Sequence, residues 1–277
     1  MVMSLGLFFI IVVLAFACEF IDASVGMGYG TIGAPVLIVM GFDPLFVIPA
    51  ILLSQAVGGL TASLFHQRNR NVSFSSRSKD LKIFLVIAGA GTLATIFAAI
   101  VALNIPKVWL KTYIGVLVLG MGVLMLINLR FNFSLKKMIG VGIISGFNKA
   151  LSGGGFGPVV TGGQIISGHK AKRAIGVTTF AEAPICITGF ITYIVVKLIK
   201  QDPTPLLSRP VGDIASSIFS TSILRWDLIV ALLIGVIFVA PLGPLLTKKI
   251  IKIKWHYILG PLIILLGAWV LIKTYLL

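Results

Sequence analysis

The sequence predicts an all-α, polytopic membrane protein, and three observations carry this prediction. The 277-residue chain has a mean hydropathy of +1.09, and 58% of its residues are hydrophobic. Only 11% of its residues are charged, whereas a soluble domain is roughly one quarter charged. The apolar residues also come in blocks long enough to cross a bilayer as helices, so the solvent that this chain requires is lipid.

Hydrophobic segments follow one another along the chain, and those near 20 residues are predicted to span the membrane. Segment 2–22 is long enough, and we interpret it as a retained membrane helix, because it lacks the basic start of a secretory signal. Whether it spans fully decides the topology. The other predicted spans are 45–65, 81–103, 109–129, 174–198, 227–247 and 257–276.

Three further apolar segments, 31–41, 138–148 and 158–167, are too short to span. Each lies beside a glycine-rich break, a pattern typical of discontinuous helices or re-entrant hairpins. The more polar segment 199–226 is predicted to be an external loop that holds a short interfacial helix around 211–224.

The chain contains an internal repeat at a separation of 127 positions. Asp22 aligns with Lys149, and Gln55 aligns with Glu182, in an ungapped frame. The glycines of the two breaks share one spacing, so that Gly26, Gly28 and Gly30 align with Gly153, Gly155 and Gly157. We therefore predict two transmembrane repeats, 1–130 and 131–277, within one integrated membrane domain.

Positive charge orients the predicted repeats. The formal net charge is +15, and most Lys and Arg residues lie between the apolar segments. We interpret them as topology signals and lipid-headgroup contacts, not as a nucleic-acid surface. Placing loop 66–80 in the cytoplasm gives each repeat one broken or re-entrant helical hairpin plus three spanning helices. An odd number of crossings inverts the second repeat, whereas a full crossing by segment 2–22 would make the repeats parallel.

The two glycine-rich breaks form the predicted substrate site. Glycine lets a ligand approach the backbone, and free amides at helix N-termini bind anions. The alternative is that these glycines only allow close helix packing. Lys149 either adds positive charge to the site or pairs with Asp22 or Glu182. The candidate substrate-binding residues are Ser24, Gly26, Gly28, Gly30, Asn148, Lys149, Ser152, Gly153, Gly154, Gly155, Gly157 and Gln164.

Polar residues within apolar segments are the candidates for proton coupling. A charge near the bilayer centre costs about 2.5–3.5 kcal/mol on insertion scales, so a charged residue there is expected to pair with another group or to have a functional role. Glu182 lies in the middle of 174–198, and burial favours the neutral form of a carboxyl, which suits a proton carrier. A structural hydrogen bond to a neighbouring helix is the alternative. Asp22 and Gln55 complete this candidate group.

Enzyme signatures are absent from the sequence. It contains three scattered histidines and no His-Glu-x-x-His motif, and no Ser/His/Asp arrangement can be proposed. We therefore expect no catalytic residues, no metal and no cofactor. His66 is interpreted as an interfacial residue, and Glu19 as a residue near a helix end. The alternatives to a secondary transporter are a passive anion channel or uniporter and, with least support, an intramembrane enzyme.

The two glycine motifs are Phe20-Ile21-Asp22 through Gly30 and Gly153-Gly154-Gly155-Phe156-Gly157-Pro158. With the basic loop after the third segment, they resemble the TauE/SafE sulfite exporter family over nearly the whole chain. The resemblance implies a multi-pass permease of the prokaryotic cytoplasmic, or inner, membrane. It also implies a secondary transporter, an exporter driven by the proton gradient, for sulfur-containing anions such as sulfite or organosulfonates.

The first motif departs from the second at one position, since Met27 stands where the second has Gly154. The two halves therefore need not bind substrate equally. The predicted partners are a small anion and the lipid bilayer, and not nucleic acid. Whether the protein forms a homodimer is left open by the sequence.

Overall fold

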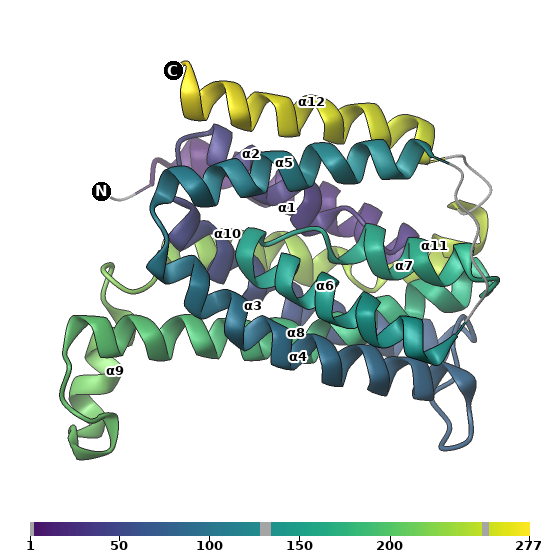
Figure 1. Ribbon diagram of the computed structural model, residues 1–277, viewed down its shortest axis with the longest axis horizontal. Helices are drawn as coiled ribbons and strands as arrows, with labels where there is room; N and C mark the ends of the chain where they lie inside the picture. Colours follow the sequence, from purple (N-terminus) through teal and green to yellow (C-terminus); the bar gives the residue numbers. More distant parts are fainter. Residues whose placement is uncertain (1–2, 128–133, 251–254) are drawn as a thin grey trace.

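The computed structural model describes residues 3–127, 134–250 and 255–277, and within these ranges the chain forms helices and no strand. The long helices run side by side along the long axis of the molecule (Figure 1). Six helices in the described ranges are long and apolar enough to span a membrane. They are α1 (Leu5–Val25), α3 (Pro44–Arg68), α4 (Lys79–Asn104), α5 (Lys107–Leu126), α8 (Ala171–Gln201) and α12 (His256–Tyr275). The predicted all-α, polytopic fold class is thus confirmed.

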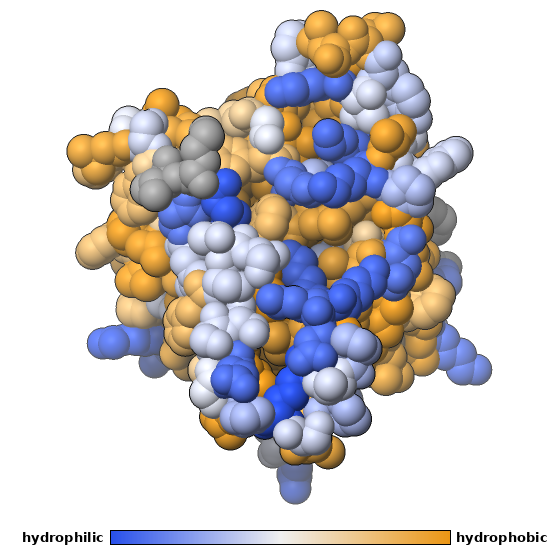
Figure 2. Space-filling model, turned by 90° about the vertical axis from the view of Figure 1, so that its left-hand side faces the viewer, coloured by the Kyte–Doolittle hydropathy of each residue, from blue (hydrophilic) through white to orange (hydrophobic). Residues whose placement is uncertain are grey.

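Large apolar side chains cover the outside of these helices. Leu5 and Phe9 of α1 and Leu93 and Phe97 of α4 are each more than half exposed. Figure 2 looks at the end of the molecule that carries both termini, where hydrophilic residues gather across the face and hydrophobic residues form the rim. Because an apolar belt of this extent is unfavourable in water, it matches the hydrocarbon layer of a bilayer.

Two helical hairpins turn back inside the bundle. The first joins α1 to α2 (Tyr29–Val39), and the second joins α6 (Leu135–Ser152) to α7 (Phe156–Ile166). The turns are buried, and Gly26 (φ 80°) and Gly153 (φ 75°) take the left-handed backbone conformation at the ends of α1 and α6. Glycine adopts this conformation without the steric cost that a Cβ brings. Segment 2–22 therefore leads into a hairpin.

Elements of the two halves correspond at the same separation of 127 positions. α2 and α7 are both 11 residues long and begin at 29 and 156. α3 and α8 begin at 44 and 171, after turns in which Gly41 and Gly168 have φ values of 101° and 86°. The relation between the two halves as inverted repeats, 1–130 and 131–277, stays a prediction. The boundary between these ranges lies outside the described residues.

The packing partners are exchanged between the halves as well. α4 packs along α6, while α10 (Trp226–Val239) and α11 (Leu242–Ile250) pack along α1. α3 packs against α8, and α5 packs against α12 (Figure 1). These pairings place helices of one half beside helices of the other.

Segment 227–247, predicted as a span, forms two helices with a bend between them. α10 ends at Val239, α11 begins at Leu242, and the two helices are bent by 59°. Pro241 stands in the break, where it cannot donate an amide hydrogen to continue the helix. Beyond the break, Gly243 packs against Ala23 of α1. The bent pair is long enough to be a further span. The predicted helix in the external loop is present as α9 (Val211–Phe219).

The two ends of the molecule differ in charge. We call the end with both termini the terminal end and the end with turns 69–78 and 167–170 the basic end (Figure 1). At the basic end His169 pairs with Asp80 at 3.1 Å, and at the terminal end Lys107 pairs with Asp43 at 2.5 Å. The positive-inside rule predicts the basic end in the cytoplasm. Its described basic residues are Arg68, Arg70, Arg77, Lys79, Lys82, Lys136, Lys137, Lys170, Lys172, Arg173, Lys248 and Lys249.

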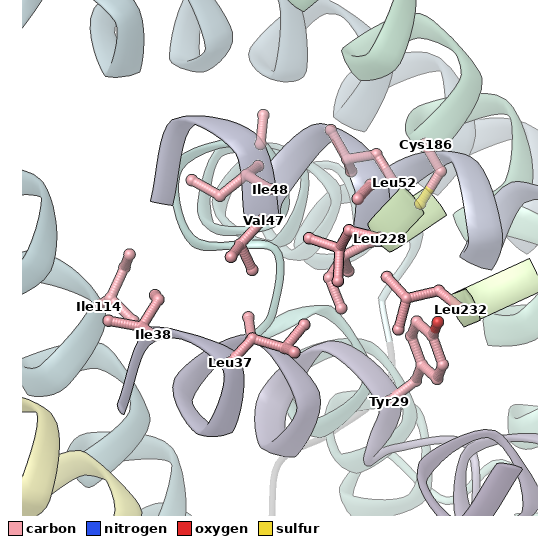
Figure 3. Packing of buried hydrophobic residues seen from close by; sticks show 14 of the residues in the cluster. Tyr29, Leu37, Ile38, Val47, Ile48, Leu52, Ile114, Cys186, Leu228 and Leu232 are labelled. Atoms are coloured by element: carbon pink, nitrogen blue, oxygen red, sulfur yellow. The ribbon is translucent and has the colours of Figure 1, made fainter. Parts of the chain in front are cut away.

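Apolar side chains fill the bundle between its centre and the terminal end. Leu37 of α2 packs with Val47 of α3 and Leu228 of α10 (Figure 3), and all three are completely buried. Tyr29 lies at the edge of this core, and its hydroxyl is 2.7 Å from Ser54 Oγ. This packing separates the polar centre of the molecule from the terminal end.

Candidate functional site

Four of the predicted residues meet in one buried chain of polar contacts. Lys149 Nζ lies 2.7 Å from Glu182 Oε1 and also donates to Gln55 Oε1. Gln55 Nε2 in turn donates to Asp22 Oδ2 at 3.3 Å. The side chains come from α6, α8, α3 and α1, and none is more than 5% exposed. We call this set the central network. It joins the two halves of the chain, because Lys149 contacts both Glu182 of its own half and Gln55, the residue that aligns with Glu182 in the other half.

The structure shows which group the Lys149 ammonium pairs with. The sequence left open whether Lys149 serves an anion site or pairs with Asp22 or Glu182. The structure pairs it with Glu182, and the side chains are 1% and 3% exposed. A buried ion pair is strongly destabilised when one partner is removed, because the other charge is left uncompensated. As long as Glu182 is ionised, it neutralises the charge of Lys149.

Asp22 is held by the beginning of the next helix. Its Oδ1 accepts a hydrogen bond of 3.2 Å from the backbone N–H of Tyr29, the first residue of α2. A carboxylate at this place satisfies a free amide and lies at the positive end of the helix dipole. A side chain of the protein therefore already occupies the helix N-terminus at the first break.

The two glycine-rich breaks lie directly against each other. A Cβ on Gly154 would lie 2.6 Å from the carbonyl oxygen of Gly30, and a Cβ on Gly157 would lie 2.5 Å from that of Gly26. A Cβ on Gly30 would overlap the carbonyl oxygen of Gly153. These approaches are possible only without a side chain. Close backbone packing is thus one function of these glycines, and their role in substrate binding stays a prediction.

The amides of the second break are partly used by the protein. Gly154 N donates to Ser152 Oγ at 3.0 Å, and Gly155 N donates to Thr31 Oγ1 at 3.3 Å. The next two amides, of Phe156 and Gly157 in the first turn of α7, make no hydrogen bond within the part of the chain that the structure describes. The N-terminus of α7 therefore retains donors that an anion could use.

The neutral candidates form hydrogen bonds away from the central network. Ser24 Oγ donates to Phe20 O within its own helix, and Ser152 Oγ donates to Asn148 O at 2.7 Å. The side chain of Asn148 accepts a hydrogen bond of 2.6 Å from the Tyr113 hydroxyl of α5. These residues support the backbone around the breaks and tie α6 to α5.

Gln164 belongs to a second buried polar group. Its Nε2 donates to Thr178 Oγ1 at 3.1 Å, and its Oε1 has no partner among the described residues. Thr161 Oγ1 lies 2.8 Å from both Thr178 Oγ1 and Gly26 O. This group connects the first break to α7 and α8, so Gln164 is linked to Gly26 and not to Lys149.

Two residues lie in surroundings that the sequence analysis did not predict. His66, expected at the interface, is completely buried beside α8. Its Nε2 lies 2.9 Å from Ala23 O, and its Nδ1 lies 3.2 Å from Asn71 Nδ2. Glu19, expected near a helix end, is 1% exposed and lies one turn from Asp22. Its three-residue spacing from Asp22 was a usable signal, because it places both carboxyls on one helix face.

A groove of about 630 Å³ reaches the breaks from the basic end. Met27, Pro158 and Val159 line its inner part, while Lys137 and Ser167 lie toward the basic end. Most of the lining is apolar and comes from α5, α6, α7 and α12. At its inner end the groove reaches Pro158, in the first turn of α7.

In the described part of the chain, no three His, Cys, Asp or Glu side chains are grouped so that they could hold a metal ion. Cys18 and Cys186 are both free and buried. The buried polar and titratable side chains at the centre are those of the central network, of the two breaks and of the Gln164 group.

Comparisons with a family model and with a known protein both find similarity over most of the chain. A family model described as Sulfite exporter TauE/SafE matches residues 10–270. The chain is 25% identical over 273 residues to the Probable membrane transporter protein YtnM of Bacillus subtilis (strain 168). This alignment covers 93% of the chain and 80% of the relative. No solved structure matches the chain.

Proposed function

The chain belongs to the TauE/SafE sulfite exporter family, and we propose that it is a secondary transporter of a small sulfur-containing anion such as sulfite or an organosulfonate. The family and the name of the relative indicate a membrane transporter rather than an enzyme. The bacterial relative supports placing the protein in a prokaryotic cytoplasmic membrane. The observation that carries the finer proposal is the buried Lys149–Glu182 pair close to two glycine-rich breaks.

The proposed anion site uses the N-terminus of α7 and the charge of Lys149. The amides of Phe156 and Gly157 supply donors, and the groove ending at Met27 supplies a route. Ser152 and Asn148 hold the backbone of this break in place. An anion in this position meets the positive end of a helix dipole within a low-dielectric site, where charge interactions are strong.

Proton coupling follows from the partner of Lys149. A proton on Glu182 would remove the negative charge that neutralises the lysine, and the ammonium would then be available to the anion. Binding of the proton and binding of the anion therefore favour each other, and this linkage is reciprocal. The two move in the same direction, so an inward proton gradient drives uptake and opposes export. The outward flux that the family description favours then requires accumulation of the anion in the cytoplasm that exceeds this gradient.

Alternating access is proposed to arise from two inverted repeats, 1–130 and 131–277. The correspondence of element bounds at 127 positions and the exchanged packing partners support this relation. The hairpins α1–α2 and α6–α7 meet at the breaks, so movement of one hairpin against the other would close the groove at the basic end and open the opposite side.

Flux into proteoliposomes tests the proposal. Purified protein would be supplied in turn with sulfite, thiosulfate, sulfate and taurine, with and without a pH gradient, as wild type and as Glu182→Gln. We expect saturable flux of one anion, accelerated by the gradient in the wild type. In the variant we expect loss of net flux, because the empty carrier would return with an uncompensated Lys149. Exchange of internal for external anion should persist.

Two other outcomes would contradict this mechanism. Flux that ignores the pH gradient and is unchanged in Glu182→Gln would indicate a channel or uniporter. The absence of flux for every anion, from protein shown to be folded, would overturn the anion proposal. The variant Asp213→Asn, which removes an exposed carboxyl of α9 far from the site, serves as the matched control.

A further inference from the structure

Glu19 is a buried carboxyl that the proposed mechanism does not use. It lies on α1 one turn before Asp22, toward the terminal end, and is 1% exposed. Its side chain makes no hydrogen bond within the described residues, and Oε2 is enclosed without a partner. Glu19 is therefore buried, and no side-chain hydrogen bond among the described residues assigns it a structural role.

The centre of the molecule holds more acid than base. Glu19, Asp22 and Glu182 are buried there, and Lys149 is the one buried Lys or Arg in the described part of the chain. Glu182 takes the ion pair with Lys149, and Asp22 receives N–H donors from Tyr29 and Gln55. Glu19 has neither an ion pair nor an N–H donor among the described residues. Because an uncompensated buried carboxylate is strongly unfavourable, Glu19 holds a proton in this state.

The protein provides space for this carboxyl. A Cβ on Gly58 of α3 would lie 2.7 Å from Glu19 Oε1 and 2.6 Å from Val236 Cγ1 of α10, so a side chain at 58 would displace the carboxyl. The counterpart of Glu19 in the other half is Gly146, which packs against the backbone of Gly91. The corresponding position of the other half is therefore filled by a glycine, so the helix packing common to both halves does not require a carboxyl there.

The surroundings of Glu19 combine titratable and apolar groups. Gly58 of α3 and Val236 of α10 face it directly, and neither titrates. The titratable and charged groups that act on it are Cys18 and Asp22 of α1, Tyr29 of α2, Lys149 of α6, and Glu182 and Cys186 of α8. Asp22, one turn along α1 from Glu19, connects this face of the helix to the central network through Gln55.

We propose that Glu19 is a second proton-binding residue of the transport cycle, in addition to Glu182. This inference rests on the proposed function. A buried carboxyl without a partner destabilises the state in which it is buried, and a state that opened Glu19 to water would remove this cost. Separation of α10 from α1 and α3 would open Glu19 toward the terminal end, where it would exchange its proton. A cycle that uses both residues moves two protons with each anion.

The charge carried with each sulfite ion tests this inference. Proteoliposomes with wild type, Glu19→Gln or Glu19→Asp would be placed under potassium diffusion potentials, and charge movement would be measured against sulfite flux. We expect Glu19→Gln to move one elementary positive charge fewer per sulfite, whatever the ionic form of sulfite. Glu19→Asp, which keeps a titratable group, and the control Asp213→Asn should retain the wild-type value. An unchanged value in Glu19→Gln would overturn the inference.

A second measurement separates this inference from the proposed function, since it needs no transport. Infrared spectra of purified protein should contain a protonated-carboxyl band that disappears on alkaline titration, is missing from Glu19→Gln and is shifted in Glu19→Asp. If no anion is transported by the wild type, the proposed function fails, and the band still reports whether Glu19 exchanges a proton. A spectrum that is the same in wild type and both variants would overturn the role of Glu19.

Discussion

His66 and Tyr193, which lie 127 positions apart, make the same contact in the two halves of the molecule. His66 Nε2 lies 2.9 Å from Ala23 O, and the Tyr193 hydroxyl donates to Ala150 O at 2.8 Å. The two carbonyls belong to the last turns of α1 and α6, where backbone acceptors lack helical partners. Because an acceptor faces Nε2, this nitrogen carries the proton in His66. Two unlike side chains thus stabilise the helix end before each break.

Removal of the Tyr193 hydroxyl should weaken the fold. Tyr193→Phe leaves the buried Ala150 carbonyl without its donor, and we expect a loss of about 1–3 kcal/mol. The midpoint of thermal unfolding in detergent would measure it. The matched control is Tyr275→Phe, because Tyr275 is 60% exposed and its hydroxyl group can exchange a protein partner for water. Equal shifts in both variants would contradict the assigned role of Tyr193.

The buried pair at the centre should show strong coupling. Lys149→Met alone leaves Glu182 as an uncompensated charge, and breaking a buried pair in this way costs about 3–5 kcal/mol. The double variant with Glu182→Gln removes both charges and should recover most of the lost stability. Thermal unfolding of the two single variants and the double variant would measure the coupling. A double variant as unstable as Lys149→Met would show that the pair is not the cause.

The contact between the breaks should tolerate no side chain. Gly30→Ala places a Cβ on the carbonyl oxygen of Gly153, which is backbone and cannot move aside cheaply. We expect this variant to give little folded, monodisperse protein in size-exclusion chromatography. Gly33→Ala, on the same helix, is the control, because its Cβ would meet only Ile51 Cδ1 at an ordinary 3.5 Å. Normal yields of both variants would argue against close packing of the breaks.

The predicted orientation can be measured by cysteine labelling. Ser75→Cys lies in the turn at the basic end and Ser216→Cys in α9 at the terminal end, and both positions are exposed. The native Cys18 and Cys186 are buried and should react little. In intact cells, a membrane-impermeant maleimide should label Ser216→Cys and should reach Ser75→Cys only after permeabilisation. The reverse pattern would place the basic end outside.

Features that depend on local chain properties were predicted best. The glycine spacing at 26–30 and 153–157 predicted two breaks, and both are present with positive φ values. The bend at Pro241 was missed, although proline is a local signal, because the hydrophobic run 227–247 is long enough for one span. Burial of His66 was missed because it depends on tertiary packing beside α8.

Composition, segment length and glycine spacing are properties of the chain itself, and they determined that this protein is a helical membrane protein with two related breaks. Tertiary structure alone decided which charges meet. Lys149 pairs with Glu182 rather than Asp22, and Glu19 is left without a partner. Such choices depend on which helices lie side by side and at what depth, because a charge interaction in a low-dielectric interior is set by distance and burial, neither of which sequence spacing records.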